Sequence, residues 1–149
     1  MKFKQFILYP AILSIIFSGI GLAAEKAQSG TANLIIHITG FKNSEGVARV
    51  AVINSKENYS QKTPYKGFNT RITDKEAIQT VPGLPQGEYA VKVFHDENEN
   101  DELDTRIFGI PAESYGFSNN ARGTLGPPEY EKAAFLLDSP EQEISIQIK

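Results

Sequence analysis

The chain has no cysteine and no tryptophan, and it contains only one methionine and two histidines. Without cysteine it can form no disulfide framework and carry no lipid-modified cysteine anchor. The two histidines, His37 and His95, are too few soft ligands for a zinc site. The fold must therefore rest on its apolar core, and an ion bound by oxygen atoms is the one further support open to it.

Positive charge is also limited, with 15 lysines and arginines against 18 aspartates and glutamates and a formal net charge of −3. No basic run occurs, which excludes nucleic acid and anionic lipid surfaces as expected partners. The glycines do not form a loop of the kind that cradles phosphate, and no serine lies in a nucleophile-elbow pattern. Nucleotide binding and the common serine-hydrolase signature are therefore not indicated.

A long apolar run occurs once, at residues 6–24, which carry no charge. Lys2 and Lys4 precede it, and Gly-Leu-Ala-Ala at 21–24 closes it, which is the order of a secretory signal peptide. The alternative is an uncleaved membrane anchor, because the run is close to the roughly 20 residues that span a bilayer. Pro10 and the scattered serines and glycines weaken a permanent helix and favour cleavage after Ala23 or Ala24.

The predicted organisation is therefore a signal peptide at 1–24, a polar linker at 25–31 and one domain at 32–149. Cleavage leaves a chain of typical single-domain size with a more negative net charge. We expect this domain in the periplasm or outside the cell, without stable insertion in a membrane. Its expected partner is an unidentified ligand of the envelope or the extracellular space.

Short apolar runs separated by turn residues fill the predicted domain, and no segment has a sustained helical period. Strands are predicted at residues 32–39, 47–54, 76–81, 88–95, 133–137 and 143–149. Alternation places Leu34, Ile36 and Ile38 on one face of the first, and in the fourth it turns Lys92 outward and three residues inward: Tyr89, Val91 and Val93. The turn signal Asn-Ser-Glu-Gly at 43–46 favours a hairpin of the first two strands, and residues 55–70 are predicted to be a polar loop. This rhythm predicts an all-β fold: an antiparallel β-sandwich of six to seven strands, transthyretin- or immunoglobulin-like, with one long aromatic loop.

The long loop, residues 96–132, contains no convincing strand but many large apolar side chains. A loop of this length is unusual in a compact domain and is normally functional, and its aromatic content argues against disorder. The loop aromatics form either a face that binds carbohydrate or peptide or a small core beneath the loops, which is the commoner arrangement. They are Tyr59, Tyr65, Phe68, Tyr115, Phe117 and Tyr130.

The long loop begins with a run of acidic and amide side chains. If Asp96 is position one, oxygen-bearing side chains fall at positions one, three, five and nine, and position seven contributes a backbone carbonyl. Calcium takes six to eight such oxygen ligands, whereas magnesium prefers fewer protein ligands. The sequence therefore predicts a Ca²⁺ site, with Glu113 as the remote carboxylate that completes it. The predicted ligands are Asp96, Asn98, Asn100, Glu102, Asp104 and Glu113.

This calcium loop departs from the EF-hand pattern in two places. Asp101 stands where the EF-hand has glycine, and position twelve is Ile107 instead of glutamate. The alternative is a solvated acidic turn paired with Arg106 or Arg122. Crowded carboxylates repel one another without a cation, which favours the metal.

A catalytic alternative is a hydrolase that acts on an envelope component and uses residues 95–118. Ser114 and Ser118 lie in this region together with Glu113 and His95, which are the types of residue that nucleophilic catalysis combines. The predicted structural role of His95 is to hydrogen-bond a loop carboxylate and orient it. The expectation we favour is a domain without catalysis, whose calcium-ordered loop presents a binding surface.

Two stretches carry a family resemblance: Gly-Leu-Pro-Gln-Gly-Glu-Tyr-Ala-Val-Lys-Val-Phe-His-Asp-Glu-Asn at 83–98 and Phe-Gly-Ile-Pro-Ala-Glu-Ser-Tyr-Gly-Phe-Ser-Asn-Asn-Ala at 108–121. Both resemble the secreted bacterial proteins catalogued as domain of unknown function 2141, which implies an exported domain but no particular activity. Leu-Pro-Gln-Gly-Glu-Tyr at 84–89 also resembles the turn of transthyretin-like and collagen-adhesin B-type sandwiches, which implies the fold alone. The last residues, Ile-Gln-Ile-Lys, differ from the Tyr-Arg-Gly-Ser end of transthyretin-like hydrolases, so that chemistry is not implied.

Overall fold

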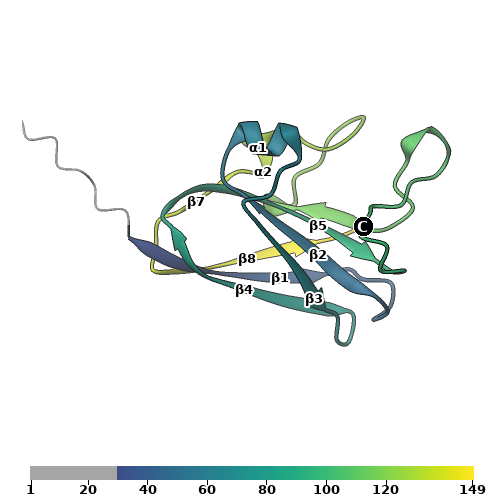
Figure 1. Ribbon diagram of the computed structural model, residues 1–149, viewed down its shortest axis with the longest axis horizontal. Coiled ribbons are helices and arrows are strands. Elements are labelled where there is room, and N and C mark those ends of the chain that lie inside the picture. Colours follow the sequence, from purple (N-terminus) through teal and green to yellow (C-terminus); the bar gives the residue numbers. More distant parts are fainter. Residues whose placement is uncertain (1–29) are drawn as a thin grey trace, which may run out of the picture.

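The computed structural model describes residues 30–149, so the predicted signal peptide and most of the predicted linker lie outside the described residues. Two β-sheets pack face to face (Figure 1). The first sheet has the order β4 (Glu76–Pro85), β1 (Thr31–Thr39) and β8 (Glu141–Gln147). The second has the order β3 (Lys66–Arg71), β2 (Val47–Ile53), β5 (Gly87–Asp96) and β6 (Tyr115–Phe117), and β7 (Phe135–Leu137) also pairs with β5.

The core between the sheets follows from the alternation of the strands. Leu34, Ile36 and Ile38 of β1 are fully buried, as their spacing predicts. They face the inward side chains of β2 and β5, and the predicted burial of Tyr89, Val91 and Val93 is confirmed. The all-β sandwich is therefore confirmed, with eight strands among the described residues instead of six to seven.

Two expectations about strand pairing are wrong. The strands at 32–39 and 47–54 do not form a hairpin, because β1 pairs with β4 and β8 while β2 pairs with β3 and β5. Between them the chain crosses from one sheet to the other, and Phe41 is buried in the core at the crossing. The sheets are also not wholly antiparallel, since β1 and β8 run parallel. Periodicity fixes which side chains face inward, but it does not say which sheet a strand joins.

The polar segment 55–70 is not a loop throughout. It contains the short helix α1 (Lys56–Gln61), which Ser55 caps by accepting a hydrogen bond from the Asn58 amide at 3.1 Å. It also contains β3, an edge strand whose alternation is weak because glycine and asparagine stand on its exposed side. The sequence signal was therefore too faint to distinguish these elements from a polar loop.

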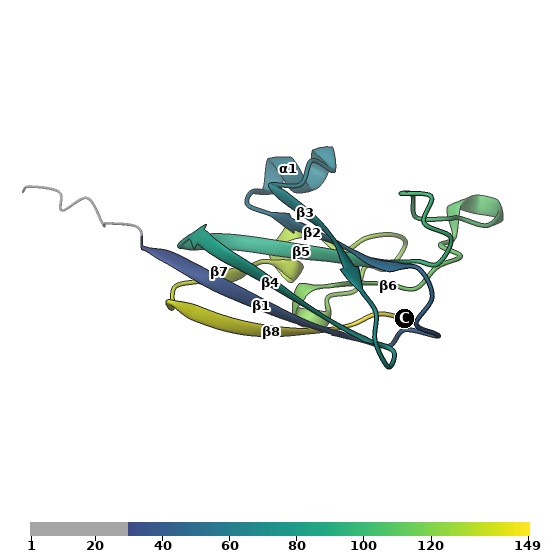
Figure 2. The ribbon, with the colours of Figure 1, turned by 60° about the horizontal axis from the view of Figure 1, so that its bottom comes forward.

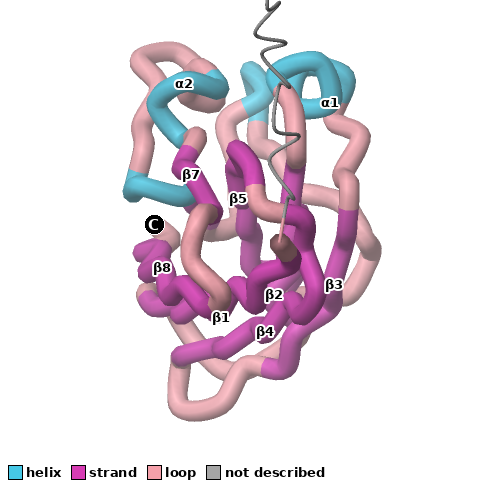
Figure 3. The backbone as a smooth tube through the Cα atoms, turned by 90° about the vertical axis from the view of Figure 1, so that its left-hand side faces the viewer, coloured by secondary structure: helices cyan, strands magenta, loops and turns pink. Residues whose placement is uncertain are grey.

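The long segment 96–132 also contains regular structure that was not predicted. The elements are a 3₁₀ turn η1 (Ile107–Gly109), strand β6, a second 3₁₀ turn η2 (Ser118–Asn120) and helix α2 (Tyr130–Ala133). At β6 the chain passes so close to β8 that a Cβ on Gly116 would lie 3.0 Å from Ile146 Cγ2. Helices α1 and α2 contact each other, and Figure 3 places them together at one end of the sandwich.

The helices and the long loop lie on the same side of the molecule. Figures 1 and 2 show α1 and the 97–114 segment on the face of the second sheet that points away from β1, β4 and β8, at opposite ends of β5. The outward residues of β2 and β5 lie between them.

Candidate ligand groove and acidic loop

Asp96 is the anchor of the acidic loop. It is the last residue of β5, its side chain is fully buried, and Oδ2 accepts hydrogen bonds from Arg49 Nε at 2.8 Å and from the Asp101 amide at 3.0 Å. Oδ1 accepts from the Asn100 amide at 3.1 Å. Because a buried charge is costly unless it is paired and hydrogen-bonded, this set of donors allows Asp96 to stay inside the protein. Gly46 makes room for it, since a Cβ there would lie 2.0 Å from the Asp96 carbonyl oxygen.

Glu113 joins the two ends of the acidic loop. Its side chain is buried, Oε1 accepts from the Glu97 amide at 3.0 Å and Oε2 accepts from the Asp104 amide at 3.0 Å. The Ala112 amide donates to the Asp104 carbonyl at 2.7 Å, which holds the residue before Glu113 against the far end of the loop. Glu113 therefore lies beside the acidic loop, as the sequence predicts, and it acts there on backbone amides.

Three of the remaining predicted ligands contact one another. The Asp104 carboxylate accepts from the side-chain Nδ2 of Asn98 at 2.9 Å and from that of Asn100 at 3.0 Å. Asn98 Oδ1 accepts from the backbone amide of Asn100 at 3.2 Å. The Glu102 side chain is exposed, and its backbone amide donates to Asn100 Oδ1 at 2.9 Å.

The atoms of this loop that could bind a metal are carboxylate and amide oxygens, which suit a hard cation such as calcium. Within residues 30–149, however, no three histidine, aspartate or glutamate side chains are grouped closely enough to form a metal centre on their own. The side-chain nitrogens of Asn98 and Asn100 face Asp104, and their oxygens accept backbone N–H groups, so calcium would require these amide groups to turn. This site stays a prediction.

The arginine beside the acidic loop was not predicted. Arg49 of β2 contacts both Asp96 and the exposed Asp101, whereas the two arginines proposed from the sequence form no ion pair among the described residues. Arg122 donates instead to the Gln147 carbonyl at 3.2 Å. Arg49 shares the outward face of β2 with Ala51, and the pairing of β2 with β5 brings it to Asp96.

Ser118 and His95, two residues of the hydrolase alternative, form hydrogen bonds with backbone groups instead of with each other. Ser118 is fully buried, and its hydroxyl accepts from the Val91 amide at 2.9 Å and donates to the Ala133 carbonyl. His95 is also fully buried, with Nε2 2.8 Å from the Glu45 carbonyl instead of a loop carboxylate. Its Nδ1 lies 3.9 Å from Glu97 Oε1. No hydrogen bond joins a serine hydroxyl to His95 in the described part of the chain.

Most of the loop aromatics form a second, smaller core, which confirms the commoner of the two arrangements considered. Tyr59, Phe117 and Tyr130 are buried together, and Tyr115 packs against them. The Tyr59 hydroxyl donates to the Pro128 carbonyl at 2.9 Å, and the rings of Tyr59 and Tyr130 meet edge to face at 5.6 Å. Burial raises the pKa of both phenols to about 12, with Glu88 adding to the effect at Tyr130. This core fixes α1 and α2 to the outward face of β5.

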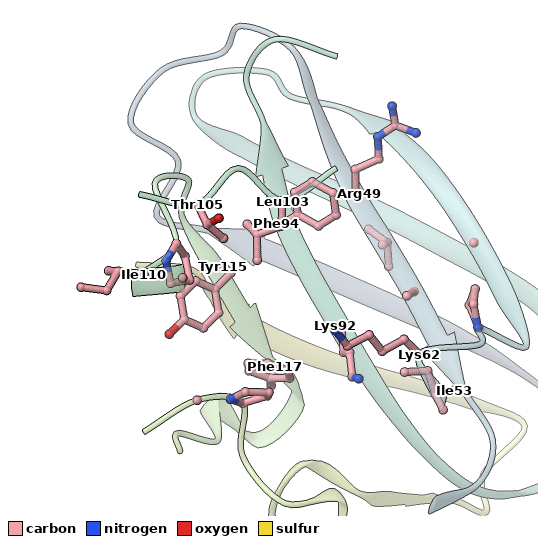
Figure 4. A pocket seen from close by; sticks show the side chains of 18 of the residues that line it. Arg49, Ile53, Lys62, Lys92, Phe94, Leu103, Thr105, Ile110, Tyr115 and Phe117 are labelled. Carbon is pink, nitrogen blue, oxygen red and sulfur yellow. The ribbon is translucent and has the colours of Figure 1, made fainter. Parts of the chain in front are cut away.

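A groove of about 910 Å³ runs over the outward face of the second sheet, between the helices and the long loop. Its floor consists of Ala51 and Ile53 of β2 together with Phe94 of β5. Figure 4 shows the side chains around it, with Lys62 and Lys92 toward one end and Leu103, Thr105 and Ile110 toward the other. The volume lies within the range of about 300–1,000 Å³ typical of sites for organic ligands.

Apolar side chains on the groove's rim point into solvent. Phe108 is 96% exposed, Leu125 is 101% exposed and Ile110 is 59% exposed. Phe108 also has a φ of 68°, a left-handed conformation that is costly for a bulky residue. The tip is closed by the Thr105–Pro111 bridge and by the Arg106 amide, which donates to the Ile110 carbonyl at 2.7 Å. The exposed aromatic ring at this rim therefore belongs to a residue with a strained backbone.

Lys92 lies at the helix end of the groove. Its ammonium group donates to the Tyr59 carbonyl at 3.0 Å and lies 3.6 Å from the centre of the Tyr59 ring. Burial lowers the pKa of Lys92, and the nearby charge of Lys62 lowers it further. The alternation of β5 predicted that Lys92 faces outward, but nothing in the sequence showed that it would meet a helix there.

Fold and site together define the class of protein: a two-sheet β-sandwich in which one sheet has a ligand-sized groove on its outward face. The chain belongs to the bacterial family described as "Uncharacterized protein conserved in bacteria (DUF2141)", whose model matches residues 36–145. The match covers the sandwich from β1 into β8 and includes the acidic loop and the groove. The family resemblance seen at residues 83–98 and 108–121 is thereby confirmed.

No curated protein and no solved structure matches the chain. In the described range, 30–149, no helix has the length and apolar character needed to cross a membrane.

Proposed function

We propose that this protein is an exported binding domain without catalytic activity, which takes an apolar ligand into the groove on the outward face of the second sheet. The observation that carries the proposal is the exposed rim formed by Phe108, Ile110 and Leu125. Several large apolar side chains exposed around one concave site are typical of a surface that a ligand or partner covers. Sequestering these side chains from water would contribute favourable free energy on binding.

Export is part of the proposal and is supported by the charged start, the apolar run and the small-residue end of residues 1–24. The ligand would then be a molecule of the periplasm or the outer surroundings. The engagement of Ser118 and His95 in hydrogen bonds with the backbone supports a role without catalysis.

Calcium at the acidic loop is the second part of the proposal. Leu103 and Thr105, which line the groove, adjoin Asp104 in the chain, so an ion that orders residues 96–104 would also order one wall of the groove. The closeness of Asn98, Asn100 and Asp104 supports this role, because their side-chain oxygens could converge on one ion once the two amide groups turn. Calcium outside the cytoplasm reaches concentrations that fill sites of moderate affinity.

The binding proposal is tested with an uncharged, polarity-sensitive dye such as Nile red. We expect saturable fluorescence enhancement with the wild-type protein and at least tenfold weaker binding with Phe108→Ser or Ala51→Trp, which remove the rim or fill the floor. Ile78→Ser is the matched control, because Ile78 is a 59% exposed side chain on β4 of the other sheet. Equal binding by all four proteins, or no binding by any, would refute the groove as the site.

A further inference from the structure

The charged residues of the groove are all of one sign. Arg49, Lys62 and Lys92 line it, and no aspartate or glutamate does, whereas Glu129 and Glu131 line the adjoining hollow that the two lysines also border. The whole chain, in contrast, has more acidic than basic residues. A concave site with one sign of charge over an apolar floor raises the local concentration of ligands of the opposite sign.

Two of these three basic side chains have no ion-pair partner among the described residues and could bind an anionic ligand. The guanidinium of Arg49 is occupied by Asp96, Asp101 and Asn69. Lys62 and Lys92, in contrast, have no carboxylate within ion-pair distance among residues 30–149. The Lys92 ammonium contacts only neutral groups of Tyr59, its carbonyl and its ring.

An anion would add a favourable charge interaction at the two lysines. Lys92 is partly desolvated, and Lys62 adds a like charge, which is why the pKa of Lys92 lies below its usual value. An anion placed between them would replace this repulsion with attraction in a site of reduced solvent access. The lysines are thus placed to bind one charged head group.

The rest of the groove is suited to an extended hydrocarbon chain. Its floor runs from Ile53 beside the lysines to Arg49, which lies four residues along β2 and therefore about 13 Å away. Aromatic and aliphatic side chains line this path, and the polar, uncharged side chains that line it are Asn69, Thr105 and Tyr115. A sugar would need more hydrogen-bonding groups than these three provide.

We infer that the groove binds a single-chain fatty carboxylate, with its carboxylate between Lys62 and Lys92 and its chain over Phe94 toward Phe108. This inference rests on the proposed function and adds the class of ligand to it. A phosphate head group is less suited, because a bidentate fork to its oxygens needs an arginine, and the arginine of this groove, Arg49, is already occupied. Both free cations of this groove are lysines.

The test is displacement of Nile red by three C12 amphiphiles below their micelle concentrations: dodecanoate, dodecanol and dodecyltrimethylammonium. We expect dodecanoate to compete at least tenfold more tightly than the other two. Lys92→Met and Lys62→Glu should each weaken the binding of dodecanoate at least fivefold and leave the binding of dodecanol unchanged. Lys132→Met, an exposed lysine outside the groove lining, is the control and should change neither.

The outcomes separate the two claims. If dodecanol and dodecanoate compete equally, the inferred anion specificity is wrong and the binding proposal stands. Dodecyl phosphate is tested in the same way as a fourth amphiphile, and if it competes more tightly than dodecanoate, the assignment to a carboxylate is wrong. If no amphiphile displaces the dye and the dye itself does not bind, the proposed function fails. Lys62→Glu keeps the test valid should Lys92→Met lose its fold, because Lys62 is exposed on the turn after α1.

Discussion

Arg49 of β2 and Asp96 of β5 are diagonal neighbours across two paired strands, and Arg49 Nε donates to Asp96 Oδ2 at 2.8 Å. The Asp96 side chain is fully buried, and the Arg49 side chain is 19% exposed. The pair joins the outward face of the second sheet to the start of the acidic loop. Arg49 therefore connects the acidic loop to the groove, because it contacts the loop and also lines the groove.

Removal of Arg49 should destabilise the protein strongly. In Arg49→Met, Asp96 would remain buried without its cation, and loss of one partner of such a pair typically costs about 3–5 kcal/mol in the free energy of unfolding. Asp101→Asn is the control, because Asp101 is 74% exposed and an exposed pair contributes about 0–1 kcal/mol. Urea unfolding measures both, and a loss for Arg49→Met no larger than for Asp101→Asn would show that the pair is not structural.

Glu113 should hold the ends of the acidic loop together. Glu113→Gln removes the charge that accepts from the Glu97 and Asp104 amides, and charge-assisted hydrogen bonds contribute about 1.5–3 kcal/mol each. We expect faster hydrogen exchange at these two amides and little change in the strands. Glu102→Gln, at an exposed position, is the control. Unchanged exchange at both amides in Glu113→Gln would contradict the clamp.

Calcium should raise the melting temperature if the acidic loop binds it. Binding to the folded state alone adds about 2.7 kcal/mol when the free ion is at one hundred times its Kd. Asp104→Asn should abolish the difference in melting temperature between millimolar calcium and chelator. Asp138→Asn, at an exposed position outside the loop, should keep this difference. Identical melting curves of the wild-type protein in calcium and in chelator would exclude the site.

Alkaline pH should loosen the second aromatic core. The pKa values of Tyr59 and Tyr130 are raised to about 12 from an ordinary 10, mainly by burial. Their contribution to stability is complete below pH 10 and is lost as the pH rises from 10 to 12, because the unfolded chain releases these protons first. Phenolate absorbance and circular dichroism during a pH titration measure the effect.

The control for the alkaline transition is Tyr65→Phe, because Tyr65 is 42% exposed. Tyr59→Phe should shrink the transition between pH 10 and 12, and Tyr65→Phe should not. Full ionisation of all tyrosines near pH 10, without loss of structure, would show that the two phenols are not held in a core.

The inward faces of the strands could be predicted from the sequence because burial imposes a period of two. Leu34, Ile36 and Ile38 had this pattern, and so did Tyr89, Val91 and Val93. The family resemblance came from local runs of residues and was equally accessible. The nearness of Glu113 to the acidic loop was predicted as well, but its role as an acceptor for two backbone amides was not.

The tertiary structure alone decided which strands pair and what meets on the outward face. Arg49 reaches Asp96 through the pairing of β2 with β5, and Lys92 reaches Tyr59 because α1 packs over that sheet. Such contacts join residues far apart in the chain, and local periodicity carries no information about them. The sequence by itself thus determined an all-β domain with an acidic loop, because these depend on neighbouring residues. The groove and its free lysines depend on the long-range register of the second sheet, and only the fold defines them.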